Sequence, residues 1–243
     1  MRWATSLALL LAFTSGAHAI LIRADRDDAE YVELATRYTA SLPVGDGEGT
    51  LIASRWILTS AAVARQAPKA LPLDGKTHEV EAVHIQGDLA LLLLRAPVRG
   101  IEPTPIYRES DEDGKTVRIV GHGETGKIGE KSAPADRKRR AGINTIDRVG
   151  ARTFDLRLKP NEDASDLQGA AAPGDRGGPA FIETKEGIFV AGVRPDDADN
   201  PVVKVGASQS YVRVSAFAAW IDATLYEAAA KEAAALMGDA DRR

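Results

Sequence analysis

The feature that most constrains the fold is a succession of short apolar or alternating runs that recur at intervals of roughly ten residues. They include TLIASRWILTS, HEVEAVHIQG, TVRIVGHG, GIFVAGVR and SYVRVSA. Clusters of Gly, Pro, Asp and Asn separate them, as expected of turns. This spacing is typical of β-sandwiches and β-barrels, because parallel sheets need helices between their strands. The sequence therefore predicts a mostly β protein, in two strand-rich halves that meet at the acidic stretch RESDEDGK, residues 108–115.

One helix is predicted, at the end of the chain, over about residues 214–237. Val214, Phe217, Ile221 and Leu225 recur at helical spacing, and EAAAKEAAAL consists of strong helix formers with weak amphipathicity. We expect the first half of this helix to dock and its second half to protrude.

Composition excludes several classes of protein. The 31 basic residues are outnumbered by 35 acidic residues, for a net charge of -4, so a general attraction to nucleic acid or anionic membranes is not expected. The chain has no cysteine, so disulfides do not hold it together. No group of His, Asp and Glu has metal-ligand spacing, and we expect neither a metal nor a cofactor.

The first 19 residues have the pattern of a secretory signal peptide. Arg2 precedes an apolar stretch over residues 4–13, and the small-x-small ending Ala17-His18-Ala19 follows. Cleavage after Ala19 would leave Ile20 as the new amino terminus. No later segment is long enough and free of charge to span a bilayer, so we expect a secreted or periplasmic protein without a membrane span.

Residues 172–181, APGDRGGPAF, contain a Gly-Asp-X-Gly-Gly-Pro turn that resembles the nucleophile loop of trypsin-like serine proteases. In that family X is the attacking serine, whereas here X is Arg176. Four further stretches resemble landmarks of the family, in the same chain order. They are GTLIASRWILTSAAVA (49–64, the histidine stretch), GDLALLLL (87–94, the aspartate stretch), IVGHGETG (119–126) and YVRVSAFAAWI (211–221).

The resemblance implies two antiparallel six-stranded Greek-key β-barrels with a C-terminal α-helix packed across the back. The first barrel would cover about residues 20–107 and the second about residues 116–213. The active site would lie in the cleft between the barrels.

Carried over residue by residue, the resemblance retains only part of the catalytic triad. The positions of the histidine, aspartate and serine are Ala62, Asp88 and Arg176, and the backbone N–H groups of Gly174 and Arg176 occupy the oxyanion-hole positions. The family's reaction needs a hydroxyl nucleophile and an imidazole base. We therefore predict a pseudoprotease that acts as a binding or regulatory module, with a peptide or protein as partner and in an oligomeric state that the sequence does not fix. The alternatives are a serine endopeptidase with an unorthodox active site and a purely structural envelope protein.

Other residues are poor replacements for the missing groups. His78, His84 and His122 are interpreted as surface or satisfied structural histidines, and His18 lies in the signal peptide. No adjacent motif would activate a serine, the nearest candidates being Ser60, Ser165 and Ser208.

Two charged runs are interpreted as solvated loops. DDADN at residues 196–200 lacks the ligand spacing of a calcium loop. DRKRR at residues 136–140 has two functional alternatives, contact with an anionic partner and a processing site for trypsin-like enzymes.

The resemblance also assigns a substrate pocket and its neighbouring strand. Ala170, Ala171 and Ala172 would line the pocket, so a bound side chain would be small or apolar. The strand on which substrate backbone usually pairs aligns with GVRPDD, residues 192–197, where Arg194 and Pro195 make pairing awkward.

Two specific contacts are predicted. In the family, a newly formed Ile α-amine pairs with the aspartate before the serine, so mature Ile20 is expected to pair with Asp175. The second contact is a clamp in which the Arg176 guanidinium lies over Ala62 and bonds Asp88, because a carboxylate left in the cleft without its histidine would need a partner.

Overall fold

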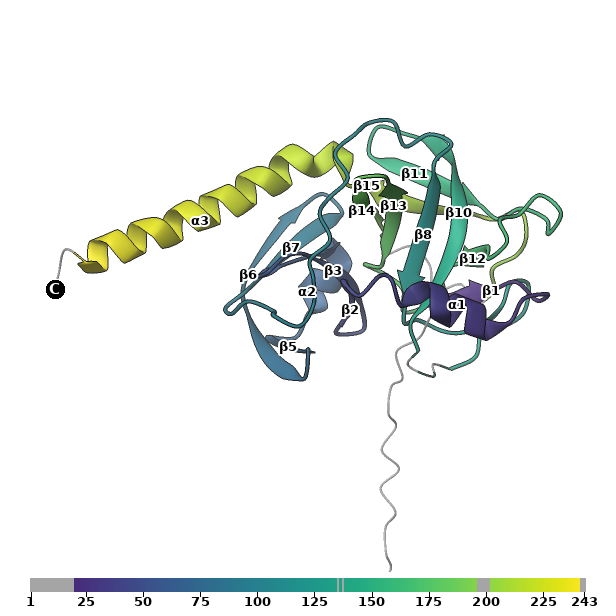
Figure 1. Cartoon of the computed structure of the whole chain (residues 1–243), viewed down its shortest axis with the longest axis horizontal. Coiled ribbons are helices and arrows are strands. Elements are labelled where there is room, and N and C mark those ends of the chain that lie inside the picture. The colour runs from purple at the N-terminus through teal and green to yellow at the C-terminus, as the bar shows by residue number, and fades with distance from the viewer. Residues whose placement is uncertain (1–19, 135, 137, 196–201, 241–243) are drawn as a thin grey trace, which may run out of the picture.

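The computed structural model describes residues 20–134, 136, 138–195 and 202–240. Figure 1 shows two β-rich bodies side by side, with a long C-terminal helix that runs outward from the junction between them.

The first body is a six-stranded antiparallel sheet in the order β2-β3-β4-β7-β6-β5. A short helix, α2 (Ala61–Gln66), follows β4 directly, capped by the Ser60 hydroxyl, which accepts a hydrogen bond from the N–H of Val63. The strands are β2 (Ser41–Val44), β3 (Gly47–Ala53), β4 (Trp56–Ser60), β5 (Ala70–Leu73), β6 (Lys76–Gln86) and β7 (Leu89–Leu94).

The second body is a closed six-stranded barrel in the order β10-β11-β15-β14-β13-β8. Its strands are β8 (Thr116–Gly121), β10 (Arg140–Val149), β11 (Thr153–Arg157), β13 (Pro179–Thr184), β14 (Gly187–Val193) and β15 (Ser208–Arg213). A small sheet beside it joins β12 (Gly169–Ala170), β1 (Leu21–Ile22) and β9 (Gly126–Lys127).

This architecture confirms the predicted fold class, with one difference in the first body. Only the second body is closed by hydrogen bonds all the way round, whereas β2 and β5 are the edges of the first sheet within the described residues. The alternating and apolar runs of the sequence form the strands, because each buries at least one face.

The residues after Ile20 pack on the second barrel, although we predicted that the first barrel begins there. Leu21 pairs with Ala170 of β12, and helix α1 (Asp28–Ala35) contacts β10. The helix begins with a capping box in which Asp27 and Glu30 satisfy each other's backbone N–H groups. The first sheet therefore begins at β2, and the preceding segment spans the back of the second barrel.

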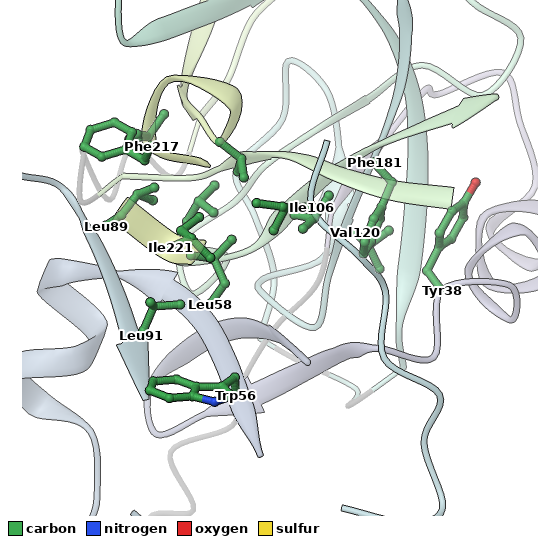
Figure 2. Close-up of a cluster of buried hydrophobic side chains, with 14 of the residues drawn as sticks. Tyr38, Trp56, Leu58, Leu89, Leu91, Ile106, Val120, Phe181, Phe217 and Ile221 are labelled. Carbon is green, nitrogen blue, oxygen red and sulfur yellow. The ribbon is translucent and has the colours of Figure 1, made fainter. Parts of the chain in front are cut away.

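A shared hydrophobic cluster joins the two bodies and the C-terminal helix. Figure 2 shows Trp56, Leu58 and Leu91 of the first sheet converging on Ile221 of the helix, with Val120 and Phe181 of the second barrel beyond them. Apolar side chains from both bodies are buried together here, so burial holds the two bodies in one arrangement.

The C-terminal helix α3 (Ala218–Ala240) follows a short 3₁₀ turn, η1 (Ser215–Phe217). Ile221 and Thr224 are buried and Ala228 packs on the shared cluster, whereas residues 231–237 are exposed. As expected, the first half docks and the second protrudes (Figure 1). Within the described residues, no helix has the length and apolarity needed to cross a membrane.

Candidate functional site

The Gly-rich loop of the second barrel lies directly against β3 and β4 of the first sheet. Gly177 has a φ of +80°, and a Cβ there would lie 2.2 Å from the carbonyl oxygen of Glu48 and 2.5 Å from the hydroxyl of Thr59. Gly121, beneath the loop, faces Asp175 so closely that a Cβ would lie 2.1 Å from its carboxylate. Close packing between the bodies therefore requires glycine at both positions.

The backbone of Arg176 is held by the first sheet. Its carbonyl accepts a hydrogen bond of 2.8 Å from the N–H of Glu48, and the next N–H, of Gly177, donates to the carbonyl of Arg194 at 2.8 Å. Gly174, on the other side of Asp175, has a φ of +93°, a conformation that favours glycine. Backbone hydrogen bonds on both sides of position 176 therefore hold the loop.

Ala62 and Asp88 lie close together at the start of α2. The N–H of Ala61 donates to the backbone carbonyl of Asp88 at 2.8 Å, which places the β6–β7 turn beside the first turn of the helix. Asp88 is exposed, and Ala62 is half-buried. The fold thus brings together the two positions that the resemblance assigns to the aspartate and the histidine, and position 62 carries only a methyl group.

The predicted clamp between Arg176 and Asp88 is wrong. Both residues are described, and they form neither an ion pair nor a hydrogen bond with each other. The physical premise fails, because the Asp88 carboxylate is exposed to water and needs no protein partner. The Arg176 side chain leaves the loop beside Gly47, where a Cβ would lie 3.2 Å from its Cγ.

A different pair of polar side chains, Glu48 and His122, joins the two bodies. Glu48 of β3 is 1% exposed, and its carboxylate accepts hydrogen bonds from the backbone N–H of His122 at 2.8 Å and from Nδ1 of the same residue at 2.9 Å. His122 directly follows β8 of the second barrel. The sequence analysis missed Glu48, although an acidic residue between two glycines in a buried strand is a signal that could have identified it.

Asp175 is a second buried acid in the same region. It is 1% exposed and accepts hydrogen bonds of 2.8 Å from the N–H groups of Gly123 and Ala172. Burial raises its pKa well above the ordinary value, and the nearby charge of Glu48 raises it further, while the N–H of Ala172 and the charge of Arg194 act in the opposite direction.

Ile20 already lies inside the second barrel. It is 1% exposed, and a Cβ on Gly169 would lie 2.7 Å from its Cγ2. The described form retains the residues before Ile20, so its α-amine is not free and the pair with Asp175 stays a prediction.

Comparison with known proteins identifies the family of this fold. The profile of the trypsin-like peptidase domain matches residues 47–192, which is more than half of the chain. The chain belongs to the trypsin-like peptidase family. No curated protein matches the chain. The matched range begins at β3 and includes both the Gly-rich loop and the inter-barrel contacts of Glu48.

In this trypsin-like domain, the three alanines of the expected pocket are well buried. Ala170, Ala171 and Ala172 are at most 8% exposed, and both backbone groups of Ala171 bond the side-chain amide of Gln209. A pocket for a small or apolar side chain stays a prediction. Of the stretch GVRPDD, Arg194 bonds the loop through its backbone, and residues 196 and 197 lie outside the described part of the chain.

Each of the three described histidines contacts a carboxylate or an aromatic ring, as expected of a structural histidine. His122 binds Glu48, Nε2 of His78 lies 3.1 Å from Asp74, and the ring of His84 lies 5.7 Å from Trp56. The three candidate serines have ordinary surroundings. The Ser60 hydroxyl caps α2, the backbone carbonyl of Ser165 accepts a hydrogen bond from the Arg23 guanidinium, and Ser208 is exposed on β15. Among the described residues, no group of three or more His, Asp and Glu side chains is arranged to hold a metal ion.

The basic run at residues 136–140 differs from the solvated loop that we predicted. Arg140 is 2% exposed and bonds two carboxylates, Asp28 at the start of α1 and Asp136. The hydrogen bonds from Arg140 hold the pKa of Asp136 below its usual range. Arg139 donates to the carbonyl of Tyr38 at 2.6 Å. The run therefore fastens α1 and β10 together, while the acidic run at residues 196–200 lies outside the described residues.

Proposed function

We propose that this trypsin-like domain is catalytically inactive and serves as an exported binding or regulatory module for a peptide or protein. One observation carries the proposal. The resemblance puts the family's nucleophile on the Gly-rich loop and its base at the start of α2, and the residues at these two positions are Arg176 and Ala62.

The chemistry of acyl transfer fails at both positions. A serine hydroxyl must lose its proton to a base as it attacks a carbonyl carbon. The guanidinium of Arg176 has no nucleophilic oxygen, and the methyl group of Ala62 accepts no proton. Asp88 would then have no imidazole to orient.

The histidine beside the loop could supply a base but not a nucleophile. The Nδ1 of His122 donates to the buried carboxylate of Glu48, which leaves Nε2 able to accept a proton. Among the described residues, no serine or threonine hydroxyl hydrogen-bonds this ring, so His122 has no nucleophile to activate.

Export is part of the proposal and rests on the first 19 residues, whose charge, apolar stretch and small-x-small ending have the pattern of a signal peptide. These residues lie outside the described part of the chain. Fractionation of the expressing cell, with the amino-terminal residue of the product sequenced, tests it. A product that begins at Ile20 in a secreted or periplasmic fraction is expected, and an intact chain in the cytosol would contradict export.

The absence of catalysis is tested by hydrolysis of a mixed peptide library, with mass spectrometry of the products. We expect no cleavage by the protein above the level of its Asp88→Ala variant, whose exposed side chain is dispensable for folding. Cleavage that Asp88→Ala abolishes would overturn the proposal in favour of an unorthodox serine endopeptidase. A purely structural role predicts instead that the same library contains no peptide retained by the immobilised protein.

A further inference from the structure

One face of the C-terminal helix α3 packs on the protein, and the opposite face is exposed. One face packs on the first sheet through Ile221, Thr224 and Ala228, and beyond them Glu232 bonds Arg55 of the β3–β4 turn. In Figure 1 the last turns extend past the first sheet.

The opposite face of α3 carries an uninterrupted apolar stripe. At 100° per residue, its members lie on the side turned away from Ala228. Every one of them is exposed, and Tyr226 and Met237 expose 76% and 69% of their surface. The stripe consists of Ala219, Ala223, Tyr226, Ala230, Ala233 and Met237.

The second half of α3 differs from an ordinary surface helix. Such a helix directs its apolar stripe to the core and its charged residues to water. Here Lys231 and Glu232 lie on the side of Ala228, while the exposed stripe residues Ala230, Ala233 and Met237 face away from it. Exposed apolar surface of this kind marks an interaction site.

The spacing of the stripe indicates the kind of partner. Its residues are separated alternately by four and three positions from Ala219 to Met237, which is the a/d spacing of a two-helix coiled coil. The partner that fits is therefore another helix with a complementary stripe.

A second copy of α3 supplies that complement in the antiparallel direction. With a two-fold axis at position 228, Tyr226 faces Ala230 of the second copy, and Met237 faces Ala219. Between these two layers, Ala223 faces Ala233. Each large side chain thus meets an alanine, which is the large-to-small matching that close helix packing needs. A parallel pair would place Tyr226 against Tyr226, and Met237 against Met237.

We propose that the outer stripe of α3 binds the same stripe of a second copy of this chain, forming an antiparallel two-helix dimer. The two bodies then lie on opposite sides of the helix pair, because each helix binds its own body through the face that carries Ala228. This inference stands independently of the proposed function.

Sedimentation equilibrium of the full chain, over a range of about 1 to 200 µM, tests the dimer. We expect a reversible rise in average mass toward that of two chains. Ala230→Glu should weaken association about tenfold or more, since it places a charge in the centre of the stripe. Ala235→Glu is the matched control, because Ala235 is equally exposed but lies on the side of Ala228, and it should associate like the unmodified chain.

The direction of pairing is tested by disulfide trapping, which the cysteine-free chain allows. Ala219→Cys and Met237→Cys, mixed after separate purification, should form a covalent heterodimer on oxidation, while neither variant should cross-link with itself. A chain that remains monomeric throughout, or association that Ala230→Glu leaves unchanged, would overturn the proposal. Self-cross-linking of Met237→Cys would contradict the antiparallel arrangement.

Discussion

Individual residues at the junction of the two bodies show how the Gly-rich loop of this trypsin-like domain is held. The loop glycines remain because β3 and β4 approach too closely for any side chain at positions such as Gly177. The inter-barrel polar contact comes from Glu48 and His122, whose pairing buries an acid at 1% exposure. The loop glycines and the buried acid therefore serve the packing between the two bodies.

The Glu48–His122 pair should contribute strongly to stability. His122→Ala leaves the Glu48 carboxylate buried without its imidazole partner, which should lower the free energy of unfolding by about 3 kcal/mol. Urea denaturation measures the free energy of unfolding of His122→Ala, of Glu48→Ala and of the double variant. The double variant should lose less free energy of unfolding than the two single variants lose in sum. As a control, the losses caused by His84→Ala and Glu48→Ala should add up in their double variant. Additive losses for the first pair would mean that the two side chains are not coupled.

Asp175 should make stability depend on pH in an unusual direction. Its pKa is raised in the folded state by burial, so between about pH 4 and that raised pKa the folded form binds more protons than the unfolded form. Stability of the form that retains the residues before Ile20 should therefore decrease as the pH rises through this window. Denaturation at a series of pH values should show that Asp175→Asn removes this part of the slope. Equal slopes for both proteins would contradict the assignment.

At the scale of elements, the attachment of α1 to β10 depends on Arg140. Arg140→Met should lower the free energy of unfolding by about 2 kcal/mol, a moderate loss because the two carboxylates it leaves, Asp28 and Asp136, are each 36% exposed and can regain water. Lys138→Met, in the same run but on the surface, should change it by less than about 0.5 kcal/mol. Chemical denaturation measures both, and equal effects would show that the run is the solvated loop we first predicted.

Most of the longer strands and α3 could be predicted from the sequence because their signals are local, whereas β2, β5 and the ten-residue strand β10 were not among the predicted runs. Alternation gives a strand a buried face, and the runs around Trp56 and Leu91 became β4 and β7. Helix α1 was missed, although Asp27 and Glu30 have the spacing of a capping box. Helix α1 is only eight residues long, which is too short to show a clear apolar periodicity in the sequence.

The polar contacts of the site could not be predicted, because they join residues far apart in the chain. Arg140 and Asp28 are separated by 112 positions, and Glu48 and His122 by 74. The clamp of Arg176 on Asp88 was inferred from the cost of an unpaired buried charge, and that cost does not arise where the β6–β7 turn leaves Asp88 in water. Burial, which depends on the whole fold, decided each of these contacts.

At the scale of the whole molecule, the amino terminus should regulate the order of the Gly-rich loop. A chain that begins at Ile20 would bring an α-amine to the second barrel, where Asp175 is buried with a raised pKa. The charged hydrogen bond would stabilise the fold by about 2 kcal/mol, or roughly 5 °C in melting temperature for a chain of this size. Calorimetry should show that residues added ahead of Ile20 lower the melting temperature. The same addition should have no effect on the Asp175→Asn variant, and an unchanged melting temperature in the unmodified chain would contradict the pair.

The central claim is that this trypsin-like domain has no activated serine, and a fluorophosphonate probe tests it most directly. Such probes bond covalently to a serine only where a base and an oxyanion site activate it. Intact-mass spectrometry of the folded protein after exposure should show no adduct, and a heat-unfolded sample should show none either. A single adduct that forms on a serine of the folded protein, and that unfolding prevents, would contradict the account.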